Sequence, residues 1–452
     1  MDINSAPRSE LVRLVYEMAD RIQLLEGEIA RLKEQLHQKA KGNNTSAQPP
    51  AFVKANKKKK KSKERRKRAA AFARKKETPT KTIFHTQEIC PDCGGNLGKP
   101  TVAYKRQVID LPVVKYSVTE HVVFRRWCYQ CRKCMQPDVA LKETVLGKSR
   151  VGINLTAMIV TMRDRLRLPI AVIQQYLKLF YHLNLSHGEI IGLLHAVAGI
   201  GKPTYNQLLD HIRKSDSVHA DETGDREDGV NGYFWSFSTK NIHFLIYRKS
   251  RAAKIVEEIV GQDSEKFNGV LTTDFYAAYN TYAGFHQRCW VHLLRDIHEL
   301  KEKYKKHPPL NSWAKKVKQI YEEAKAYTGP DPGTKPGLAI QERLAKQHYF
   351  EEKLKEICKD SVAKDIPQST LCGRIMTFMP ELFIFVRFPN VSSDNNQAER
   401  ILRHTVVARK ISGGTRSPKG SETKSILTSL FDTWQLQNLN PFEQCKILLA
   451  AC

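Results

Sequence analysis

Apolar residues near the start of the chain recur at alternating steps of four and three, with charged residues and glutamine filling most positions between them. Such a seam is typical of a coiled coil, in which two or more helices bury the stripe against each other. We therefore predict an oligomerising, leucine-zipper-like coiled coil over residues 1–40; the alternative is a single amphipathic helix packed on its own domain. The seam residues are Leu11, Val15, Met18, Ile22, Leu25, Ile29, Leu32 and Leu36.

Two later stretches have the apolar pattern of short strands, and each leads into an aspartate. In the first, apolar and polar residues alternate up to Asp221 and Glu222, and this strand is expected to end just before Gly224. The second is the apolar run 269–273, which is followed by Asp274. An aspartate at a strand end commonly serves a turn or a cap, which is the alternative role for both residues.

A third acidic residue, Glu399, lies near an expected helix start, because Ser393 and Asp394 can cap a helix. Carboxylates from two strands and one helix could converge in a cluster. Such a cluster repels itself unless cations fill it, and two hard cations bridged by carboxylates can align a phosphoryl displacement. Strand alternation points Glu222 to the face opposite Asp221, so it is not assigned to the cluster.

The pattern around these acids predicts a mixed α/β domain. Strands are expected at 233–237 and 243–247, followed by a crossover helix at 252–260, the strand that leads to Asp274, and a further strand through Cys289. The pattern then becomes helical and charged up to residue 377. Helices are also expected after residue 425, as support for the sheet.

The segment 141–213 is expected to be helical, with a break around Asn184. Two helices joined in this way suggest a helix–turn–helix unit whose second helix reads DNA. Helix pairs of this length are also common packing units, which is the alternative.

The charge of the chain favours a polyanionic partner. It carries 74 Lys and Arg residues against 47 Asp and Glu residues, for a net charge of +27. The excess is concentrated in residues 54–76, where dense like charges favour disorder and salt-sensitive, sequence-independent binding to phosphates. No run is apolar enough to span a bilayer, and no signal peptide is recognised, so a DNA partner in the cytoplasm, at the nucleoid, is expected rather than a membrane. The candidate DNA contacts are Arg65, Arg66, Lys67, Arg68, Arg400, Arg403, Arg409 and Lys410.

Two Cys-x-x-Cys pairs, separated by an interval expected to be rich in strands (104–124), predict a zinc ribbon over residues 82–140. Each pair supplies two thiolates to a tetrahedral ion. The first pair is Cys90 and Cys93, and the second is Cys128 and Cys131. Cys134 could replace Cys128, because it stands at the same spacing from Cys131. A further Cys289-x-x-His292 motif lacks two recognisable additional ligands, so a packed cysteine and a hydrogen-bonded histidine are favoured there over zinc.

Several ordered motifs together resemble the transposases of the insertion sequence 66 family. The resemblance extends from the N-terminal leucine repeat nearly to the end of the chain. It is carried by the stretches His219–Gly224, Asp274–Asn280, Cys289–His292, Asn395–Arg400 and Arg409–Gly414.

The resemblance implies a DDE transposase with an RNase H-like fold and with Asp221, Asp274 and Glu399 as its catalytic triad. It implies two Mg²⁺ (or Mn²⁺) ions per active site, which activate water to free a 3′-hydroxyl at the element's end and then activate that hydroxyl to attack target DNA. The implied partner is double-stranded DNA, both the terminal repeats of the element and the target. A homodimer or higher oligomer is expected, and the resemblance leaves open a need for accessory transposition proteins. The family's zinc finger matches Cys128 and Cys131 as its second pair.

Three other functions compete with this one. The first is a zinc-containing DNA-binding regulator, the second is a catalytically inactive transposase derivative, and the third is an RNase H-like nuclease without strand transfer. The expected organisation, in chain order, is a coiled coil (1–40), a basic disordered linker (41–81), a zinc-ribbon-like domain (82–140), a helical DNA-binding domain (141–213), the first part of the catalytic domain (214–294), a helical insertion (295–377), and the second part of the catalytic domain with the C-terminal helices (378–452).

Overall fold

A computed structural model of the chain divides into two compact units, Met1–Leu111 and Pro112–Cys452, and each is described by itself. The expected coiled coil and the basic cluster at residues 65–68 lie outside the described residues. The structure describes residues 78–111, 115–138, 144–147, 149–261, 266–330, 336–362 and 365–451.

The described part of the first unit contains one ordered turn. Cys90 N–H donates to Gly95 O and Gly94 N–H donates to Cys90 O, at 2.8 and 3.0 Å, and Gly94 has a φ of 69°. Glycine reaches this left-handed conformation without the steric cost that a Cβ imposes. An antiparallel bridge between Ile89 and Asn96 closes the turn.

In the second unit, strands β1 (Arg126–Cys128) and β2 (Lys133–Met135) form an antiparallel hairpin around the second cysteine pair. The expectation of strands at 104–124 is wrong for the residues described there, because none of them is in a strand. A strand needs a hydrogen-bonded partner, and the apolar side chains of this interval, Val108 and Phe124 among them, are exposed instead of packed.

Three helices follow: α2 (Ile153–Asp164), α3 (Ile170–Tyr181) and α4 (His187–Arg213). The break between α3 and α4 confirms the one expected near Asn184. His182 ends α3 in the left-handed conformation, and Ser186 begins α4 with a capping box, in which its hydroxyl accepts from Glu189 N–H and its own N–H donates to Glu189. Apolar residues of all three helices, such as Ile159, Ile173 and Leu193, form one buried cluster.

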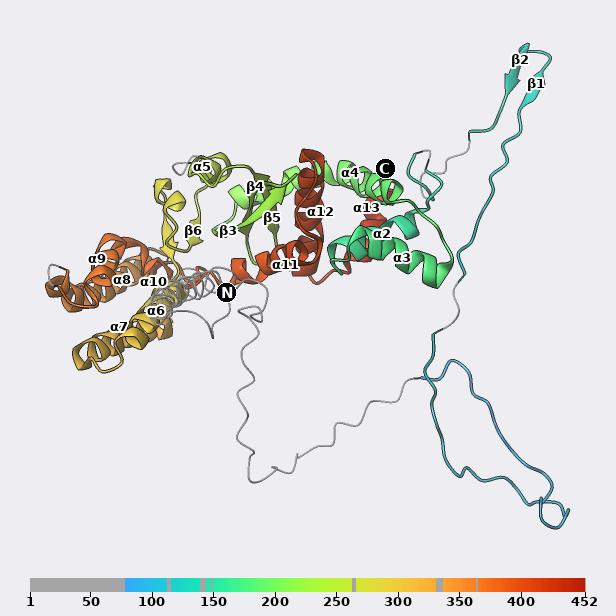
Figure 1. Cartoon of the computed structure of the whole chain (residues 1–452), viewed down its shortest axis with the longest axis horizontal. Coiled ribbons are helices and arrows are strands. Elements are labelled where there is room, and N and C mark those ends of the chain that lie inside the picture. Colours follow the sequence, from blue (N-terminus) through green and yellow to red (C-terminus); the bar gives the residue numbers. More distant parts are fainter. Residues whose placement is uncertain are drawn as a thin grey trace, which may run out of the picture. The chain divides into compact units, whose positions relative to one another are not determined.

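The centre of the unit is a five-stranded sheet of order β5-β4-β3-β6-β7 (Figure 1). β3, β4 and β5 form an antiparallel meander, whereas β6 and β7 add to β3 in parallel. The expected strands and the crossover helix are present, although the last strand ends at Arg288 instead of running through Cys289, which begins α6 as its N-cap, and the domain is a mixed α/β one. The bounds are β3 Ser217–Glu227, β4 Val230–Ser238, β5 His243–Arg248, α5 Lys254–Val260, β6 Val270–Thr273, the short 3₁₀ helix η1 Ala277–Thr281 and β7 His286–Arg288.

The edge strand β5 is covered by α12 (Pro418–Leu436). Three hydroxyls of α12, spaced four residues apart, accept hydrogen bonds from backbone N–H groups of β5: Ser425 from Tyr247, Ser429 from Leu245 and Thr433 from His243. An uncovered edge would present free backbone groups to other chains. The expected support of the sheet by a C-terminal helix is therefore confirmed.

Helices lie on both faces of the sheet. Apolar residues of α4, α5, α12 and α13 (Pro441–Ala450) pack with one face in the main core, around Trp235 and Phe237. On the other face, Leu402 of α11 (Asn396–Ser412) packs against Phe234 and Leu245.

Between β7 and α11 the chain forms a helical cluster, which has a core of its own around Trp290, Trp313 and Phe383. Figure 1 shows these helices gathered beyond β6. Among the described residues, no helix is long and apolar enough to cross a bilayer. The cluster contains α6 Trp290–Lys303, α7 Pro308–Ala326, α8 Pro336–Cys358, η2 Lys359–Ser361, α9 Ser369–Thr377, η3 Met379–Glu381 and α10 Ile384–Arg387.

Candidate active site

Strand register brings Asp221 and Asp274 to the same level of the sheet. β3 and β6 are parallel neighbours, with Ser217 opposite Val270 and His219 opposite Thr272. Extending this register by two residues places Asp221 level with Asp274, the first residue after β6. The expectation that the strand ends before Gly224 is wrong: β3 continues to Glu227, because its residues up to Glu227 remain paired with β4.

Glu399 lies on the same face of the sheet as Asp221. Asp221 pairs with Ser236, and residues two apart on a strand share a face, so Asp221 lies on the side of Phe234. That side is covered by α11 through Leu402. Glu399 stands one turn before Leu402, in the first turn of α11, and thus on the same side of the helix.

The electrostatics of Asp221 agree with this arrangement, although the largest contribution from a charge comes from the adjacent Glu222. Burial and then the charges of Glu222, Asp274 and Glu399 raise the pKa of Asp221 to about 8. In addition, Glu399 Oε1 is a buried atom without a hydrogen-bond partner among the described residues. Carboxylates held together in this way favour protons or cations as partners.

The donor set suits a hard divalent cation, since carboxylate oxygens are the ligands that Mg²⁺ and Mn²⁺ prefer. In the part of the chain that the structure describes, no group of three or more His, Cys, Asp or Glu side chains is already arranged closely enough to hold an ion. The orphaned oxygen of Glu399 and the raised pKa of Asp221 fit such an ion.

Glu222 is separated from this group by strand alternation, as expected. It pairs with Trp235, whose side chain lies in the main core. Its carboxylate accepts hydrogen bonds from the Tyr279 hydroxyl, at 2.6 Å, and from Arg251 Nε, at 3.0 Å.

Arg288 fixes the backbone at Asp274, a role that the sequence analysis missed. This fully buried guanidinium donates to Asp274 O at 2.9 Å, to Asn280 Oδ1 at 2.6 Å and to Glu381 Oε2 at 2.6 Å. A buried arginine needs such partners for its charge. The position of Arg288 at the end of β7 was visible in the sequence, but its partners were not.

The expected basic residues of α11 lie at its two ends, and only Arg400 and Arg403 are close to Glu399 along the helix. Arg400 and Arg403 are exposed within a turn or so of Glu399, and Lys410 is exposed at the far end of the helix. Arg409 Nη1 donates to Thr223 Oγ1 at 3.3 Å. Arg409 also lines a cavity of about 440 Å³ between β3, β4 and the end of α11. The other lining residues are Gly224, Asp225, Arg226, Asn231, Gly232, Tyr233, Gly413 and Gly414.

Each cysteine pair of the expected zinc ribbon is a turn in which hydrogen bonds favour a thiolate. Backbone hydrogen bonds from Cys93 and Asp92 lower the pKa of Cys90, and a backbone hydrogen bond from Cys131 lowers the pKa of Cys128. The Cys131 N–H to Cys128 Sγ distance is 3.4 Å. Thiolates are the form that binds zinc. The two pairs belong to the two separate units.

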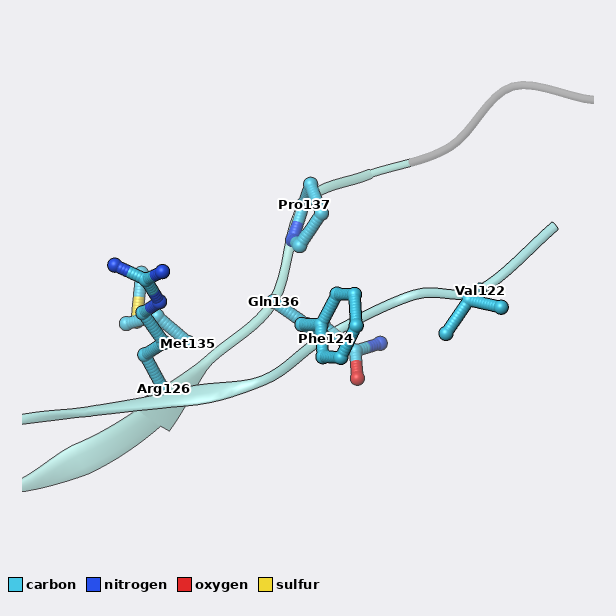
Figure 2. A pocket seen from close by; sticks show the side chains of 6 residues that line it. All are labelled: Val122, Phe124, Arg126, Met135, Gln136 and Pro137. Atoms are coloured by element: carbon cyan, nitrogen blue, oxygen red, sulfur yellow. The ribbon is translucent and has the colours of Figure 1, made fainter.

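Cys134 instead lies in β2, where it pairs with Trp127. Figure 2 shows the groove over this hairpin, with Arg126 and Met135 side by side as their pairing requires; the groove has a volume of about 510 Å³. The hydrogen bond from Cys131 to Cys128 favours Cys128 over Cys134 as the partner of Cys131.

Both the region of the carboxylates and the region of the cysteine pairs match known protein families. Residues 148–423 match the family described as Transposase IS66 family, and residues 87–132 match the zinc-finger binding domain of transposase IS66. The second match contains Cys90, Cys93, Cys128 and Cys131 and ends before Cys134, and it supports a structural zinc.

One curated relative is an uncharacterized protein, y4jD, of Sinorhizobium fredii (strain NBRC 101917 / NGR234). It is 24% identical over an alignment of 343 positions that covers 70% of this chain and 65% of the relative. The chain thus spans a little under two thirds of the length of that relative. Because the first family match covers more than half of the chain, and its ordered motifs lie within that match, the chain belongs to the IS66 family of transposases.

Proposed function

We propose that the protein is a DNA transposase that cleaves the 3′ ends of its element and joins them to target DNA, with Asp221, Asp274 and Glu399 as the ligands of two divalent cations. The observation that supports the proposal is the shared face of these three side chains: Asp221 is level with Asp274 on neighbouring parallel strands, and Glu399 lies on the helix that covers that face. They come from β3, from the end of β6 and from α11, all within the matched region.

The strand order supports an RNase H-like domain. An antiparallel meander of three strands, extended on the side of its first strand by two parallel strands, is the arrangement that this fold requires, and it puts the first acid on the central strand. Fold alone does not establish activity, so the proposal depends on the carboxylates and not on the sheet.

The residues of the chain divide the work between holding ions and holding DNA. The three carboxylates hold the cations, and Arg288 keeps the backbone of Asp274 in place. Arg400 and Arg403 are exposed beside Glu399, where they can neutralise phosphates and orient a strand toward the acids. The cations, when bound, would lower the pKa of the attacking hydroxyl group and stabilise the leaving oxygen.

The test uses the full chain and duplex DNA made from the segments that flank its gene, both intact and pre-cut to expose a 3′-hydroxyl. Asp221→Ala, Asp274→Ala and Glu399→Ala should each reduce cleavage and strand transfer by at least about 100-fold, since a ligand of the ions is lost. DNA affinity should stay within about threefold, because Lys and Arg contacts to phosphate supply most of it.

A matched control is Asp210→Ala, which removes an exposed aspartate of α4 and should leave both reactions unchanged. Full cleavage by all three triad variants would overturn the catalytic proposal and leave a DNA-binding protein. Cleavage without joining of the pre-cut ends would indicate a nuclease instead of a transposase.

A further inference from the structure

The Cys289-x-x-His292 motif follows β7 and forms the start of α6, with Cys289 as the N-cap, and it is bound to the segment that leads into α11. Cys289 is fully buried, and its Sγ accepts a hydrogen bond from Asn395 N–H at 3.1 Å. The next residue, Trp290, donates its N–H to Ser393 O at 3.0 Å. Two consecutive residues of the motif therefore hold the two ends of the short stretch Ser393–Asn395.

Asn395 in turn joins this stretch to the strand of the first aspartate. Its side chain is buried, with Nδ2 donating to Ala220 O at 2.8 Å and Oδ1 accepting from His219 Nδ1 at 3.0 Å. Its carbonyl accepts the N–H of Glu399 at 3.2 Å. One residue thus connects β3 directly before Asp221, the thiol of Cys289 and the first turn of α11.

His292 lies in the first turn of α6, and its imidazole is close to the Glu399 carboxylate. Its Nε2 is 3.5 Å from Glu399 Oε1, which is longer than a hydrogen bond. Both side chains are only partly exposed, at 26% and 29%. Glu399 Oε1 and His292 Nδ1 are both buried atoms without a hydrogen-bond partner among the described residues. His292 is therefore a side chain next to the Glu399 oxygen that lacks a hydrogen-bond partner, and it can influence the position of that carboxylate.

The geometry does not favour a metal site at the motif itself. The described residues contain no group of three or more potential ligands around Cys289 and His292. The thiol is already used as the acceptor for Asn395, and burial raises its pKa, so the protonated form is favoured. A metal-bound cysteine is instead a thiolate.

We propose that Cys289 and His292 are positioning residues for Glu399: Cys289 fixes the start of α11 through Asn395, and His292 orients the carboxylate. This inference rests on the proposed function, in which Glu399 is a ligand of the catalytic cations. Partners that hold metal-ligating side chains in place commonly affect metal affinity by about 10- to 100-fold. Neither residue needs to touch DNA or a cation to act in this way.

The first test measures Mn²⁺ binding to the full chain on pre-cut DNA that lacks the reactive 3′-hydroxyl, by electron paramagnetic resonance, so that no reaction is required. Cys289→Ala removes the acceptor and should weaken Mn²⁺ binding about 10-fold. Cys289→Ser keeps an acceptor at nearly the same place and should restore most of the affinity. Both are compared with Cys445→Ala, which removes an equally buried thiol from α13.

The control matters because both alanine variants leave a similar cavity and should lower the melting temperature by similar amounts. Only Cys289→Ala should change Mn²⁺ affinity. Equal Mn²⁺ affinity in Cys289→Ala, Cys445→Ala and wild type would overturn the role of Cys289. Loss of bound zinc in Cys289→Ala would also overturn it, by making this cysteine a metal ligand.

His292 is tested by a pair of substitutions. His292→Gln keeps an N–H donor close to the position of Nε2, whereas His292→Ala removes it. The alanine variant should bind Mn²⁺ about 10-fold more weakly and the glutamine variant nearly normally, with DNA affinity unchanged in both. Equal Mn²⁺ affinity in the two variants would overturn the role of His292.

The two proposals fail in different ways. If Glu399→Ala binds Mn²⁺ as tightly as wild type does, Glu399 is not a ligand and the proposed function fails. If Glu399→Ala loses Mn²⁺ but Cys289→Ala and His292→Ala do not, the proposed function stands and only the positioning role is wrong.

Discussion

The hydroxyl of Tyr279 donates a 2.6 Å hydrogen bond to Glu222 Oε2, on the face of the sheet opposite to the one that carries Asp221. Arg251 binds the same carboxylate, and its guanidinium lies 3.8 Å from the centre of the Tyr276 ring. Glu222 is thus held in a structural network although it is adjacent to Asp221 in the sequence. The two acids can be separated by experiment.

We predict that Glu222→Gln retains cleavage, whereas Asp221→Asn loses it. Glutamine keeps an oxygen that can accept from Tyr279 and has nearly the same volume. Glu222→Ala should cost about 1–3 kcal/mol of stability, because it leaves the buried Tyr279 hydroxyl without a partner. Cleavage assays with melting curves check both points. Active Asp221→Asn together with inactive Glu222→Gln would show that the wrong acid was assigned.

Asp221→Asn should stabilise the protein when divalent cations are removed with a chelator. The pKa of Asp221 is raised to about 8 by burial and neighbouring acids, so the folded state binds more protons than the unfolded state between pH 4 and 8. Stability from this group therefore falls as the pH rises through that window. At pH 8 we expect a gain on the order of 1 kcal/mol, or roughly 2 °C.

Thermal unfolding in chelator at pH 5 and pH 8 measures this effect. The difference between Asp221→Asn and wild type should be larger at pH 8, and added Mn²⁺ should reverse it by stabilising wild type alone. A lower melting temperature for Asp221→Asn at pH 8 in chelator would contradict the electrostatic argument.

The zinc finger should hold about one zinc per chain, bound by Cys90, Cys93, Cys128 and Cys131. Cys93→Ser and Cys128→Ser should each lose the metal and the fold of residues 82–140, because structural zinc contributes on the order of 10 kcal/mol in small modules. Cys134→Ser should keep both and is the matched control. Elemental analysis settles the matter: protein purified without chelator and free of zinc would refute the site.

Asp432 of α12 should be a main stabilising residue, since it joins three other elements in a buried network. Its carboxylate binds His243 Nδ1 of β5 at 2.9 Å and also Arg165 at the end of α2, and His404 of α11 is 3.7 Å away. Removing one partner of such a network costs about 3–5 kcal/mol. Asp432→Asn should therefore unfold at a clearly lower denaturant concentration, and Asp210→Asn, at an exposed site, should not.

The same residue predicts a pH dependence. Burial alone would raise the pKa of Asp432, but His243, His404 and Arg165 outweigh burial and lower it. The folded-state pKa is below the unfolded value, so the stabilisation is present above that value and is lost as the pH falls. Asp164, beside it, has a raised pKa and opposes this trend. On acidification below about pH 4, the free energy of unfolding should therefore fall less for Asp432→Asn than for wild type. An equal fall in the two proteins, measured by denaturant unfolding, would contradict this prediction.

The N-terminal seam, which lies outside the described residues, should drive self-association. Changing Ile22 and Ile29 together to Asp places charges in the apolar seam and should dissociate the oligomer. The control changes Gln23 and Ala30 to Asp, which adds the same charge one residue away from the seam. Light scattering that shows an unchanged mass for the Ile22 and Ile29 variant would refute the coiled coil.

The sequence by itself determined the local elements and the candidate chemistry of this protein. Alternating apolar residues predicted the strands around Asp221, because a half-buried strand turns every second side chain toward the core and the others away from it. The same alternation separated Asp221 from Glu222. The spacing of the cysteines indicated the zinc finger, since each turn of this length presents two sulfur atoms to one ion. These are local relationships, fixed by neighbours along the chain.

Only the tertiary structure decided which distant residues meet. The length of β3 depends on its pairing with β4, so the sequence ended that strand too early. The strands expected at 104–124 are absent from the residues described there, because a strand exists only with a partner. The hydroxyls of Ser425, Ser429 and Thr433 are spaced for one helix face, but their use in covering β5 required the sheet edge to be placed.

The same holds for the site. Cys289 and His292 were visible as a pair, but their contacts with Asn395 and Glu399 join residues about 106 positions apart. Contacts of this range depend on how α6 and α11 pack against the sheet, and no periodicity or spacing within either helix encodes that packing. The sequence therefore supplied the acids, and the packing of β3, β6 and α11 made them into one site.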